Sequence, residues 1–297
     1  MKKLFVLLFL VQFCFAQNAQ LTNTQLIKNA NWKLNDIGNG IVWKSYHFNN
    51  KELFEANQYI NILQTKLKNK KITFGIRAAD SLKTDTKAKR LLLPTSKIAI
   101  QNNAIAAVNA GFFDIKNGGA VDFLKINHTI TDTTRLIDVP RLPFHSISAV
   151  TIHKNKVKII KGEQKSGWEK ALKEENVLLT GPLLLYNNRE ESLAKNPFND
   201  NRHPRTCACI TNDKKLLLIT VDGRSSESYG MTLPELTTLA KSLNCKDAIN
   251  FDGGGSTTMY INNQPENGVV NYPSDNKLFD HAGERSVSNI FVLLKNK

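Results

Sequence analysis

The chain has 297 residues, of which 41% are hydrophobic and 22% charged, and its formal net charge is +14. This length can bury a substantial core in one or two domains, and the composition is ordinary for a globular protein. The lysines are scattered, and the sequence has neither a basic helix nor interleaved aromatic and basic residues. These features argue against a nucleic-acid-binding protein, although a basic chain can still attract phosphate-bearing glycans.

The first residues have the layout of a secretory signal peptide. Two lysines precede an apolar run from Leu4 to Phe15, and Ala16 is followed by a polar stretch. The run is too short for a transmembrane helix, which needs about 20 apolar residues. We therefore expect residues 1–16 to be a signal peptide and the mature protein to be secreted or periplasmic.

The mature chain is expected to stay basic and to carry no membrane anchor. Removal of Lys2 and Lys3 lowers the charge from +14 to +12. Lipoprotein anchoring through Cys14 is disfavoured, because Gln12 and Phe13 are poor residues before a lipidated cysteine. No later stretch is apolar enough to span a bilayer, so we expect no integral membrane segment.

Residues 17–36 are polar and rich in Asn, Gln and Thr, and we expect them to be a mobile leader to a folded domain at 37–297. From residue 41 the pattern becomes mostly strand-like. A helix is expected to begin near residue 95, with Thr95 or Ser96 as its N-cap. Alternating apolar and polar residues predict strands at 41–48, 58–67, 71–79 and 104–110, and a hairpin within 146–162.

The second half continues the alternation of strands with few helices. A short helix is expected at 166–174, and the apolar run at 177–188 should bend at Gly181-Pro182. Residues 205–224 predict a hairpin that turns at Asn212-Asp213. Further strands are expected at 247–251, 257–263 and 285–294.

The clearest helix follows Thr232. Thr232 and Glu235 form a T-x-x-E capping box, and Pro234 lies in the first turn, where proline is tolerated. Its apolar residues recur at helical spacing: Leu233, Leu236, Leu239, Ala240 and Leu243. The whole pattern predicts an α+β fold, a single domain built on a large mixed or antiparallel β-sheet with a few packed helices.

The cysteines of the mature chain do not predict a disulfide framework. The mature chain has three cysteines, Cys207, Cys209 and Cys245. Their number is odd, and they lack the dense spacing that is typical of a disulfide framework. Cys207 and Cys209 alternate in "TCACIT" and should share one face of a strand. We expect buried free thiols, since a metal site would need more ligands.

Polar residues beside glycine end several predicted strands, and such positions often form sites on a sheet. Asp222 and Asp252 end the apolar runs "LLLITV" and "AINF". Two such carboxylates can serve acid–base chemistry or hold a cation, or each can simply cap a turn. Arg205 and Arg224 can bind a phosphate, or pair with a nearby aspartate.

Other nucleotide and nucleophile motifs are missing. "DGGGST" lacks the spacing and the lysine of a P-loop, and it is not followed by a helix. "GRSSES" has no G-x-S-x-G elbow, so Ser225 and Ser226 are not predicted nucleophiles. His203 beside Cys207 is read as a lone surface histidine rather than part of a thiol site.

The motifs "VNAGFFD", "TGPLLLYNN", "HPRTCACI", "GERSVSN" and the long block from Thr220 to Ser256 resemble the phosphodiester glycosidase family. The resemblance covers residues 40 to 297 and is strongest from Asn109 onward. It implies hydrolysis of the glycosidic C–O bond of a sugar-1-phosphate diester, which releases free sugar and a phosphomonoester. Ser286 departs from the family, which usually has proline after "ER".

The resemblance also points to particular residues. By position it implies catalytic roles for Asp252, Asp222, Arg205 and Glu284. It implies substrate binding by Asn109, Asp114, Thr206, Arg224, Gly253, Gly254, Ser256 and Arg285.

The implied chemistry relies on charge stabilisation. Arginines, among them Arg205 and Arg285, would hold the phosphate, and the glycines would let it lie against backbone N–H groups. Either Asp252 or Asp222 would orient water or stabilise the oxocarbenium-like carbon. The expected partner is therefore a sugar-1-phosphodiester or a phosphate-bearing glycan.

Two other functions fit the same residues. One is a phosphoglycan-binding module without turnover, and the other is a phosphodiesterase that cuts the P–O bond. A divalent cation, calcium by its preference for oxygen ligands, is a further candidate, although the spacing matches no EF-hand. Neither the sugar nor the oligomeric state follows from the sequence.

Overall fold

The computed structural model describes residues 21–80, 90–135 and 142–296. The predicted signal peptide, with Cys14, lies outside these residues, as do residues 17–20 of the predicted leader. None of the helices in the described part of the chain is long and apolar enough to cross a membrane.

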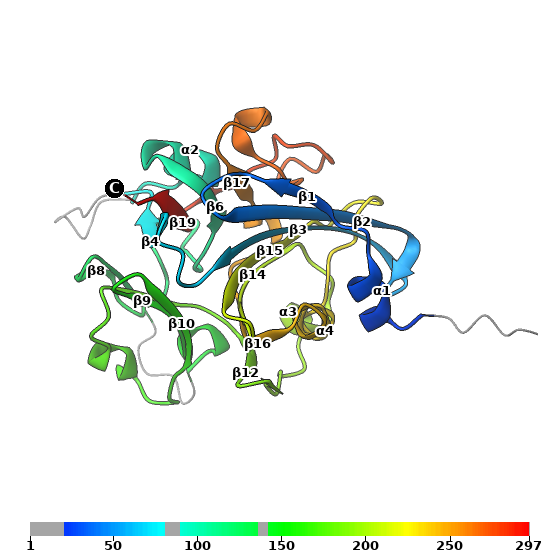
Figure 1. The fold of residues 1–297 in the computed structure, drawn as a ribbon. Coiled ribbons are helices and arrows are strands. Elements are labelled where there is room, and N and C mark those ends of the chain that lie inside the picture. Colours follow the sequence, from blue (N-terminus) through cyan, green and yellow to red (C-terminus); the bar gives the residue numbers. More distant parts are fainter. Residues whose placement is uncertain (1–20, 81–89, 136–141, 297) are drawn as a thin grey trace, which may run out of the picture.

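An eight-stranded sheet forms the centre of the molecule (Figure 1). Neighbouring strands in it are antiparallel, and its order is β1-β2-β3-β15-β14-β16-β12-β13. In chain order its strands are β1 (Lys33–Asp36), β2 (Ile41–Leu53), β3 (Ala56–Lys66), β12 (Leu183–Tyr186), β13 (Arg189–Glu190), β14 (Arg205–Thr211), β15 (Lys215–Val221) and β16 (Cys245–Asn250).

Three smaller antiparallel sheets complete the β-structure. The four-stranded sheet has the order β17-β6-β19-β4 and the five-stranded sheet the order β10-β9-β11-β7-β8, while β18 pairs with β5. Their strands are β4 (Ile72–Ala78), β5 (Leu93–Pro94), β6 (Ala104–Asn109), β7 (Leu124–Ile126), β8 (Thr129–Asp132), β9 (Ser148–His153), β10 (Lys156–Lys161), β11 (Asn176–Leu179), β17 (Met259–Ile261), β18 (Ser286–Val287) and β19 (Asn289–Lys295).

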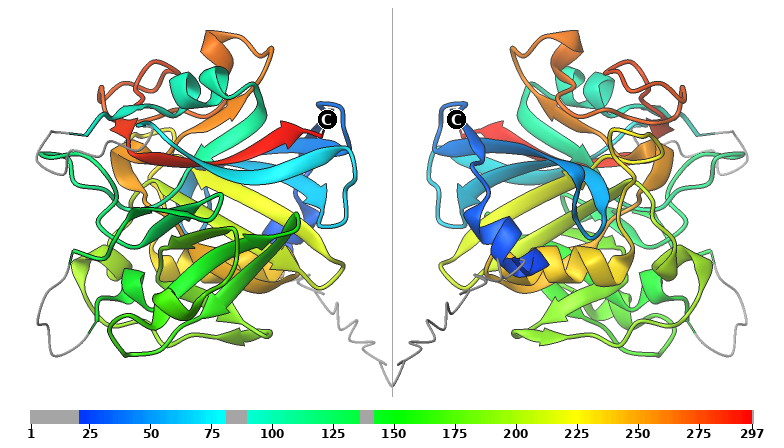
Figure 2. Two further views of the ribbon diagram at one scale, coloured as in Figure 1. Left: turned by 90° about the vertical axis from the view of Figure 1, so that its left-hand side faces the viewer. Right: turned by 90° about the vertical axis from the view of Figure 1, so that its right-hand side faces the viewer.

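Few helices accompany these sheets. The α-helices are α1 (Asn23–Asn29), α2 (Thr95–Gln101), α3 (Pro197–Asp200) and α4 (Leu233–Ser242), and short 3-10 helices lie at Phe144–Ser146, Trp168–Ala171, Gly254–Ser256 and Glu266–Gly268. The capping box at Thr232 and Glu235 is present at the start of α4, as predicted. Figure 2 shows α1 and α4 together beside the central sheet.

The alternation along the central strands separates two hydrophobic cores. Ala208 and Leu218 face a core shared with the four-stranded and five-stranded sheets. Cys207 and Ile219, one residue away on the same strands, face the core covered by α1 and α4. The chain therefore folds as a single α+β domain in which a large sheet is covered on both faces, and the predicted fold class is confirmed.

The expectation that residues 17–36 form a mobile leader is wrong for residues 23–36, which contain a helix and a strand. Residues 23–29 form α1, which begins with a capping box between Thr22 and Gln25. Ile27 is 1% exposed in the core that includes α4, and β1 pairs with β2. The polar composition gave no indication of this helix, because a single buried isoleucine and a good N-cap are enough to stabilise one short helix.

The expectation of free thiols is also wrong for two of the three cysteines. Cys209 and Cys245 form a disulfide with a Cα–Cα distance of 5.8 Å, and Cys207 is the buried free thiol. An odd count leaves one thiol unpaired but does not forbid a bridge between neighbouring strands. β14 and β16 are such neighbours: Cys245 is paired with Thr211, two residues from Cys209, so the bridge joins the two strands diagonally.

Candidate active site

The strand ends predicted to carry chemistry meet at one edge of the central sheet. Strands β14, β15 and β16 are adjacent and antiparallel, so the start of β14 lies beside the ends of β15 and β16. Arg205 pairs with Val221, and Cys207 pairs with Asn250. This arrangement places Asp222 and the loop after Asn250 at the same edge.

Asn109 joins this edge to the four-stranded sheet. Its Oδ1 accepts hydrogen bonds from Thr206 Oγ1 at 2.7 Å and from Thr258 N at 3.1 Å. Its Nδ2 donates to the carbonyl oxygen of Asp252 at 2.6 Å. The Asp252 N–H in turn donates to Ala110 O at 2.8 Å. Asn109 and Thr206 therefore position Asp252 from behind, where they are buried.

Asp252 presents a half-buried carboxylate at this edge. Its Oδ1 accepts a hydrogen bond from the N–H of Gly253 at 2.9 Å. Burial raises the pKa of Asp252 to about 6, while the nearby Ser256 hydroxyl, the Gly253 N–H and the positive charge of Arg285 oppose that rise. The carboxylate is therefore mostly ionised at neutral pH.

Asp222 is fully buried and incompletely satisfied. Its Oδ1 accepts a hydrogen bond from Asn271 Nδ2 at 2.7 Å, whereas Oδ2 has no hydrogen-bond partner among the described residues. Burial raises the pKa of Asp222 to about 7. An unpartnered buried oxygen is costly, so its presence at a strand end indicates a functional position.

The glycine run after Asp252 makes room for other groups. A methyl group on Gly253 would lie 2.6 Å from Pro204 O, and one on Gly254 would lie 2.9 Å from Arg224 Nη2. A methyl group on Gly255 would lie 2.6 Å from Arg285 Nη2. Side chains at these positions would therefore displace the neighbouring backbone or the two guanidinium groups.

The expected backbone cradle is not formed by the first two glycines. Gly253 N–H donates to the Asp252 carboxylate, and Gly254 N–H donates to Pro204 O at 2.8 Å. The Ser256 hydroxyl is buried and has no hydrogen-bond partner among the described residues. The lack of side chains in the glycine run thus mainly leaves space for the guanidinium groups of Arg224 and Arg285.

Arg224 and Arg285 each approach one residue of the glycine run, Gly254 and Gly255 respectively. Arg285 pairs with Asp275, with an Nε–Oδ1 distance of 3.0 Å. Arg224 has no hydrogen bond or ion pair to any described residue. Burial and the charge of Arg285 lower the pKa of Arg224, which remains a cation. Two guanidinium groups beside Asp252 form a positively charged position that suits a phosphate.

Arg205 does not belong to this positive position. Its side chain is 1% exposed, and its Nε donates to Met231 O at 2.8 Å. Its Nη2 donates to Phe198 O at 2.6 Å and to Asn201 O at 3.0 Å, and its Cζ lies 5.1 Å from the Phe198 ring centroid. The geometry contradicts a phosphate-binding role, because these donors already hold the surrounding loops.

Glu284 and Asp114 are also placed away from the predicted chemistry. Glu284 accepts hydrogen bonds from the Ser96 N–H, at 2.9 Å, and from the Ser96 hydroxyl, so it caps the N-terminus of α2. This replaces the predicted cap by Thr95 or Ser96, because α2 starts at Thr95 and its N-cap is Pro94. The carboxylate of Glu284 is thereby committed to the helix rather than to a substrate.

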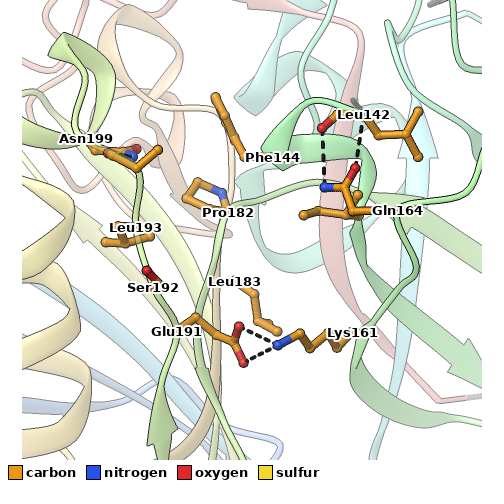
Figure 3. Close-up of a pocket in the computed structure, with 12 residues that line it drawn as sticks. Leu142, Phe144, Lys161, Gln164, Pro182, Leu183, Glu191, Ser192, Leu193 and Asn199 are labelled. Atoms are coloured by element: carbon orange, nitrogen blue, oxygen red, sulfur yellow. Dashed lines mark hydrogen bonds and ion pairs between the residues drawn. The ribbon is translucent and has the colours of Figure 1, made fainter. Parts of the chain in front are cut away.

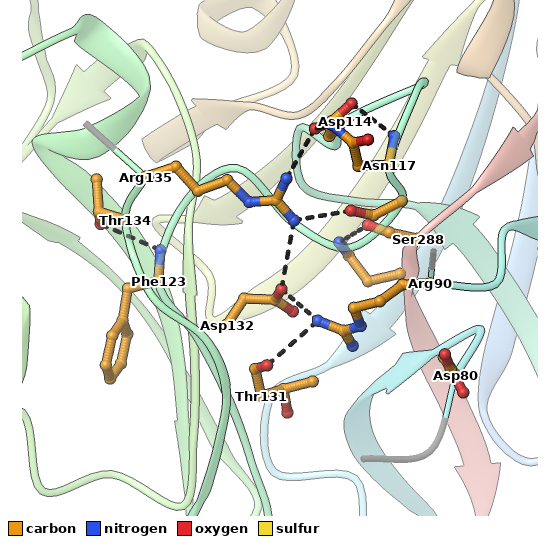
Figure 4. Close-up of polar contacts among 12 residues, drawn as sticks. Asp80, Arg90, Asp114, Asn117, Phe123, Thr131, Asp132, Thr134, Arg135 and Ser288 are labelled. Atoms are coloured by element: carbon orange, nitrogen blue, oxygen red, sulfur yellow. Dashed lines mark hydrogen bonds and ion pairs between the residues drawn. The ribbon is translucent and has the colours of Figure 1, made fainter. Parts of the chain in front are cut away.

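Asp114 belongs to a separate group of charges (Figure 4). It accepts hydrogen bonds from the Asn117 side chain at 2.9 Å and from Arg135 at 2.8 Å. Arg135 also lies 3.9 Å from Asp132, which pairs with Arg90. This ion-pair cluster fixes the loop that follows β6, and Asp114 shapes that loop rather than facing Asp252.

Sequence reasoning missed three groups near the carboxylates. Asn271 holds Asp222, and Asp275 holds Arg285. Tyr272 directly follows Asn271 in the chain and is the third group. The stretch "NYPSDNKLFDHAGER" has no regular alternation, so only its density of polar and aromatic residues between two strands could have marked it.

A cavity of about 540 Å³ lies between the five-stranded sheet and the end of the central sheet, away from the carboxylates (Figure 3). Its lining is mainly apolar and includes Phe144, Pro182 and Leu183, together with the Lys161–Glu191 ion pair at 2.7 Å. None of the predicted site residues lines it.

The comparison with protein families decides the assignment. The model of the phosphodiester glycosidase family matches residues 102–294, which include the strand ends, the glycine run and the loop with Asn271. The chain belongs to the phosphodiester glycosidase family. Phosphodiester-glycosidase-type activity is therefore the broad function that the family supports.

Solved structures share the fold of this chain. The zebrafish N-acetylglucosamine-1-phosphodiester alpha-N-acetylglucosaminidase catalytic domain, auto-inhibited by its pro-peptide, has a TM-score of 0.65 and 17% identity over 86% of this chain and 84% of that chain. A hypothetical protein from Synechocystis has a TM-score of 0.63 and 14% identity, and covers 90% of this chain and 64% of its own. At these identities the likeness shows the fold alone.

Two other relatives extend the comparison. A putative exported protein from Burkholderia pseudomallei K96243 has a TM-score of 0.58 and 14% identity over 81% of this chain and 74% of that chain. The SPbeta prophage-derived uncharacterized protein YomE of Bacillus subtilis (strain 168) is 42% identical over 67 residues. That match spans 21% of this chain and 10% of the Bacillus protein.

No metal centre is evident in the described part of the chain. Among residues 21–80, 90–135 and 142–296, no three His, Cys, Asp or Glu side chains gather where they could hold a metal ion. Asp222 and Asp252 are instead surrounded by amide, hydroxyl and guanidinium groups.

Proposed function

We propose that the chain hydrolyses the glycosidic C–O bond of a sugar-1-phosphate diester. Water adds its oxygen to the anomeric carbon, and the phosphate leaves with the former bridging oxygen, so the products are a free sugar and a phosphomonoester. The observation that carries the proposal is that two guanidinium groups, those of Arg224 and Arg285, approach the glycine run directly after Asp252 in a chain of this family.

Arg224 and Arg285 would hold the phosphate. The glycine run lets both guanidinium groups approach the backbone next to Asp252, and Asp275 orients Arg285. A phosphomonoester is a better leaving group than an alcohol, so stabilisation of its charge should contribute more than a strong general acid. The N–H donors of Arg224 have no partner among the described residues. Arg224 is therefore the group best placed to stabilise the charge that develops on the leaving phosphate.

The two carboxyl groups would divide the remaining work. Asp252, with a pKa of about 6, is mostly ionised at neutral pH and would orient water or stabilise the oxocarbenium-like carbon. Asp222, with a pKa of about 7, keeps part of its proton and would act from behind the site, where it holds Asn271 at the start of the loop that carries Arg285. Asn109 and Thr206 would act as positioning residues for Asp252.

Export is part of the proposal. The disulfide between Cys209 and Cys245 supports it, because such bonds persist mainly in oxidising compartments. The natural substrate would then be a phosphate-bearing glycan outside the cytoplasm. Calcium remains a candidate cofactor, and we include a chelator in the test for that reason.

The test is hydrolysis of sugar-1-phosphodiesters by the purified mature chain, with and without chelator. We expect reducing sugar to be released and, in ¹⁸O-water, the label to enter the sugar. Asp252→Asn should lower kcat by at least about 100-fold. Asp213→Asn, at the opposite end of the β14–β15 hairpin, is the matched control and should keep full activity.

Each alternative function has its own result in this test. Label in the phosphate would identify a phosphodiesterase that cuts the P–O bond. Saturable binding of the diester without any product would identify a binding module. Either result would replace the proposed hydrolysis of the C–O bond.

A further inference from the structure

Four aromatic side chains gather beside Asp222, outside the hydrophobic cores. The Tyr272 and Phe279 rings are parallel, with centroids 4.0 Å apart and an interplanar angle of 9°. His281 stacks on Tyr272 at 4.4 Å, and Tyr59 meets Tyr272 edge-on at 5.0 Å. All four are half-buried, and none belongs to the four hydrophobic clusters of the described residues.

The loop that carries three of these rings is internally braced. Asp275 N donates to Gly283 O at 3.1 Å, and Asn276 Nδ2 donates to Asp280 Oδ1 at 2.8 Å. His281 Nδ1 lies 2.6 Å from Asn271 O, and because a carbonyl only accepts, the imidazole donates there. The rings are therefore presented by a preformed loop rather than by a free chain.

The same loop reaches both parts of the candidate active site. It begins at Asn271, which donates to Asp222, and it ends at Arg285 beside the glycine run. Tyr59 approaches Asp222 from the central sheet, since Asp222 N donates to Tyr59 O at 3.0 Å. Burial raises the pKa of Tyr59 to about 12, with Tyr272 and Asp222 contributing.

Packing alone is a poor explanation for this cluster. Tyr272 is the middle ring of the stack, covered by Phe279 at 4.0 Å and by His281 at 4.4 Å, whereas the half-buried Phe279 and His281 each keep one ring face turned away from Tyr272. A pyranose has a surface complementary to such an outer face, because its C–H groups carry positive partial charge that the negative face of an aromatic ring attracts.

We propose that Tyr59, Tyr272, Phe279 and His281 form a sugar-binding platform that holds the pyranose ring of the transferred sugar beside Asp222. This inference rests on the proposed function and names the part of the site that selects the sugar. The platform binds the sugar through its C–H face, while Arg224 and Arg285 bind the phosphate. Specificity for the sugar then resides in the 271–285 loop.

The experiment uses substitutions of Phe279 in the mature chain, with the sugar-1-phosphodiester that the wild type hydrolyses best. Phe279→Ala should raise KM about tenfold and change kcat by less than about twofold. Phe279→Leu keeps apolar packing but has no ring face, so it should behave like Phe279→Ala. Phe279→Trp should restore a low KM. Leu278→Ala, at a neighbouring side chain that is 62% exposed, is the matched control.

Inhibitors separate the platform from the phosphate position. Inhibition by the free sugar should weaken in Phe279→Ala by the same factor as KM, whereas inhibition by phenyl phosphate should stay unchanged. A KM for Phe279→Ala equal to that of Leu278→Ala would overturn the platform. Restoration of KM by Phe279→Leu would also overturn it, because that result would assign the ring a packing role.

Failure of the proposed function can be told apart from failure of the platform. If the wild type hydrolyses no diester, saturation-transfer NMR with free N-acetylglucosamine and free glucose still reports binding to the aromatic protons. Transfer that is present in the wild type and lost in Phe279→Ala supports the platform alone. An absence of transfer for both sugars would contradict it, whatever the outcome of the hydrolysis assay.

Discussion

At the residue scale, the arginines show how far residue type and motif can carry a site prediction. The sequence marks Arg205 and Arg224 equally, since each stands next to a strand end. The structure separates them: Arg205 donates to three backbone carbonyls, whereas Arg224 lies over Gly254 with free donors. Which way a side chain turns from a strand end depends on loops distant in sequence, and no local pattern encodes it.

This difference predicts opposite effects for two similar substitutions. Arg224→Ala should lower kcat/KM by about 100-fold and leave the melting temperature nearly unchanged, because an exposed donor to the phosphate is lost. Arg205→Ala should lower the free energy of unfolding by about 3 kcal/mol, since buried carbonyls lose a charged donor. Thermal melts and kinetics of both variants check this. A stable but inactive Arg205→Ala variant would contradict this and support phosphate binding by Arg205.

Asp222 makes stability depend on pH with a definite sign. Its pKa is raised from the ordinary value of 3.8 to about 7, so the folded state binds more protons than the unfolded state between these values. The stability that Asp222 supports is therefore fully present below about pH 4 and is lost as pH rises through about 7.

Asp222→Asn should accordingly stabilise the protein at pH 8, by about 1–3 kcal/mol, and have little effect at pH 4. Denaturant titrations at the two pH values measure the difference. Asp213→Asn is the control, because the pKa of that exposed aspartate is lowered and its removal should bring no gain at pH 8. A gain at pH 4 that equals the gain at pH 8 would contradict the buried, proton-binding carboxyl group.

At the element scale, the helix and hairpin predictions rest on short-range signals and hold well. The β9–β10 and β14–β15 hairpins and helix α4 with its capping box lie where the sequence predicts them. Helix α1 was missed because its polar composition outweighed one buried isoleucine. The cap of α2 was misassigned because its acceptor, Glu284, is 188 residues away from Ser96.

The distant cap gives a prediction for α2. Glu284→Gln removes the negative charge at the helix N-terminus and weakens the bonds to Ser96, so the free energy of unfolding should fall by about 1 kcal/mol. Turnover should change by less than about threefold, since Glu284 does not face Asp252. Equilibrium unfolding and kcat together check this. A loss of about 100-fold in kcat with unchanged stability would return Glu284 to the catalytic residues.

At the scale of the whole molecule, the fold class followed from alternating strands and few helices, whereas the sheet order did not. Neighbours such as β3 with β15, or β6 with β19, are far apart in the chain, and nothing local selects them. The candidate site could be predicted only in part for the same reason. Asp222 and Asp252 were identifiable as strand-end carboxylates, but Asn271 and the aromatic loop depend on long-range packing.

The disulfide ties two strands of the central sheet and should contribute to global stability. Cys209→Ser combined with Cys245→Ser opens a link between residues 36 apart and should cost about 2–4 kcal/mol. Reduction of the wild type should have the same effect, while Cys207→Ser serves as the control for a change of thiol. Equal stability of the oxidised wild type and the double variant would show that the bond does not constrain the fold.

The approach of Arg285 to the glycine run has a consequence for biosynthesis. Asn289 Oδ1 accepts the Gly111 N–H at 2.7 Å, and Arg285 reaches the glycine run from the same segment as Asn289. The candidate site therefore cannot assemble on a nascent chain until residues 285–289 have left the ribosome. Chains that stop before these residues would lack this geometry.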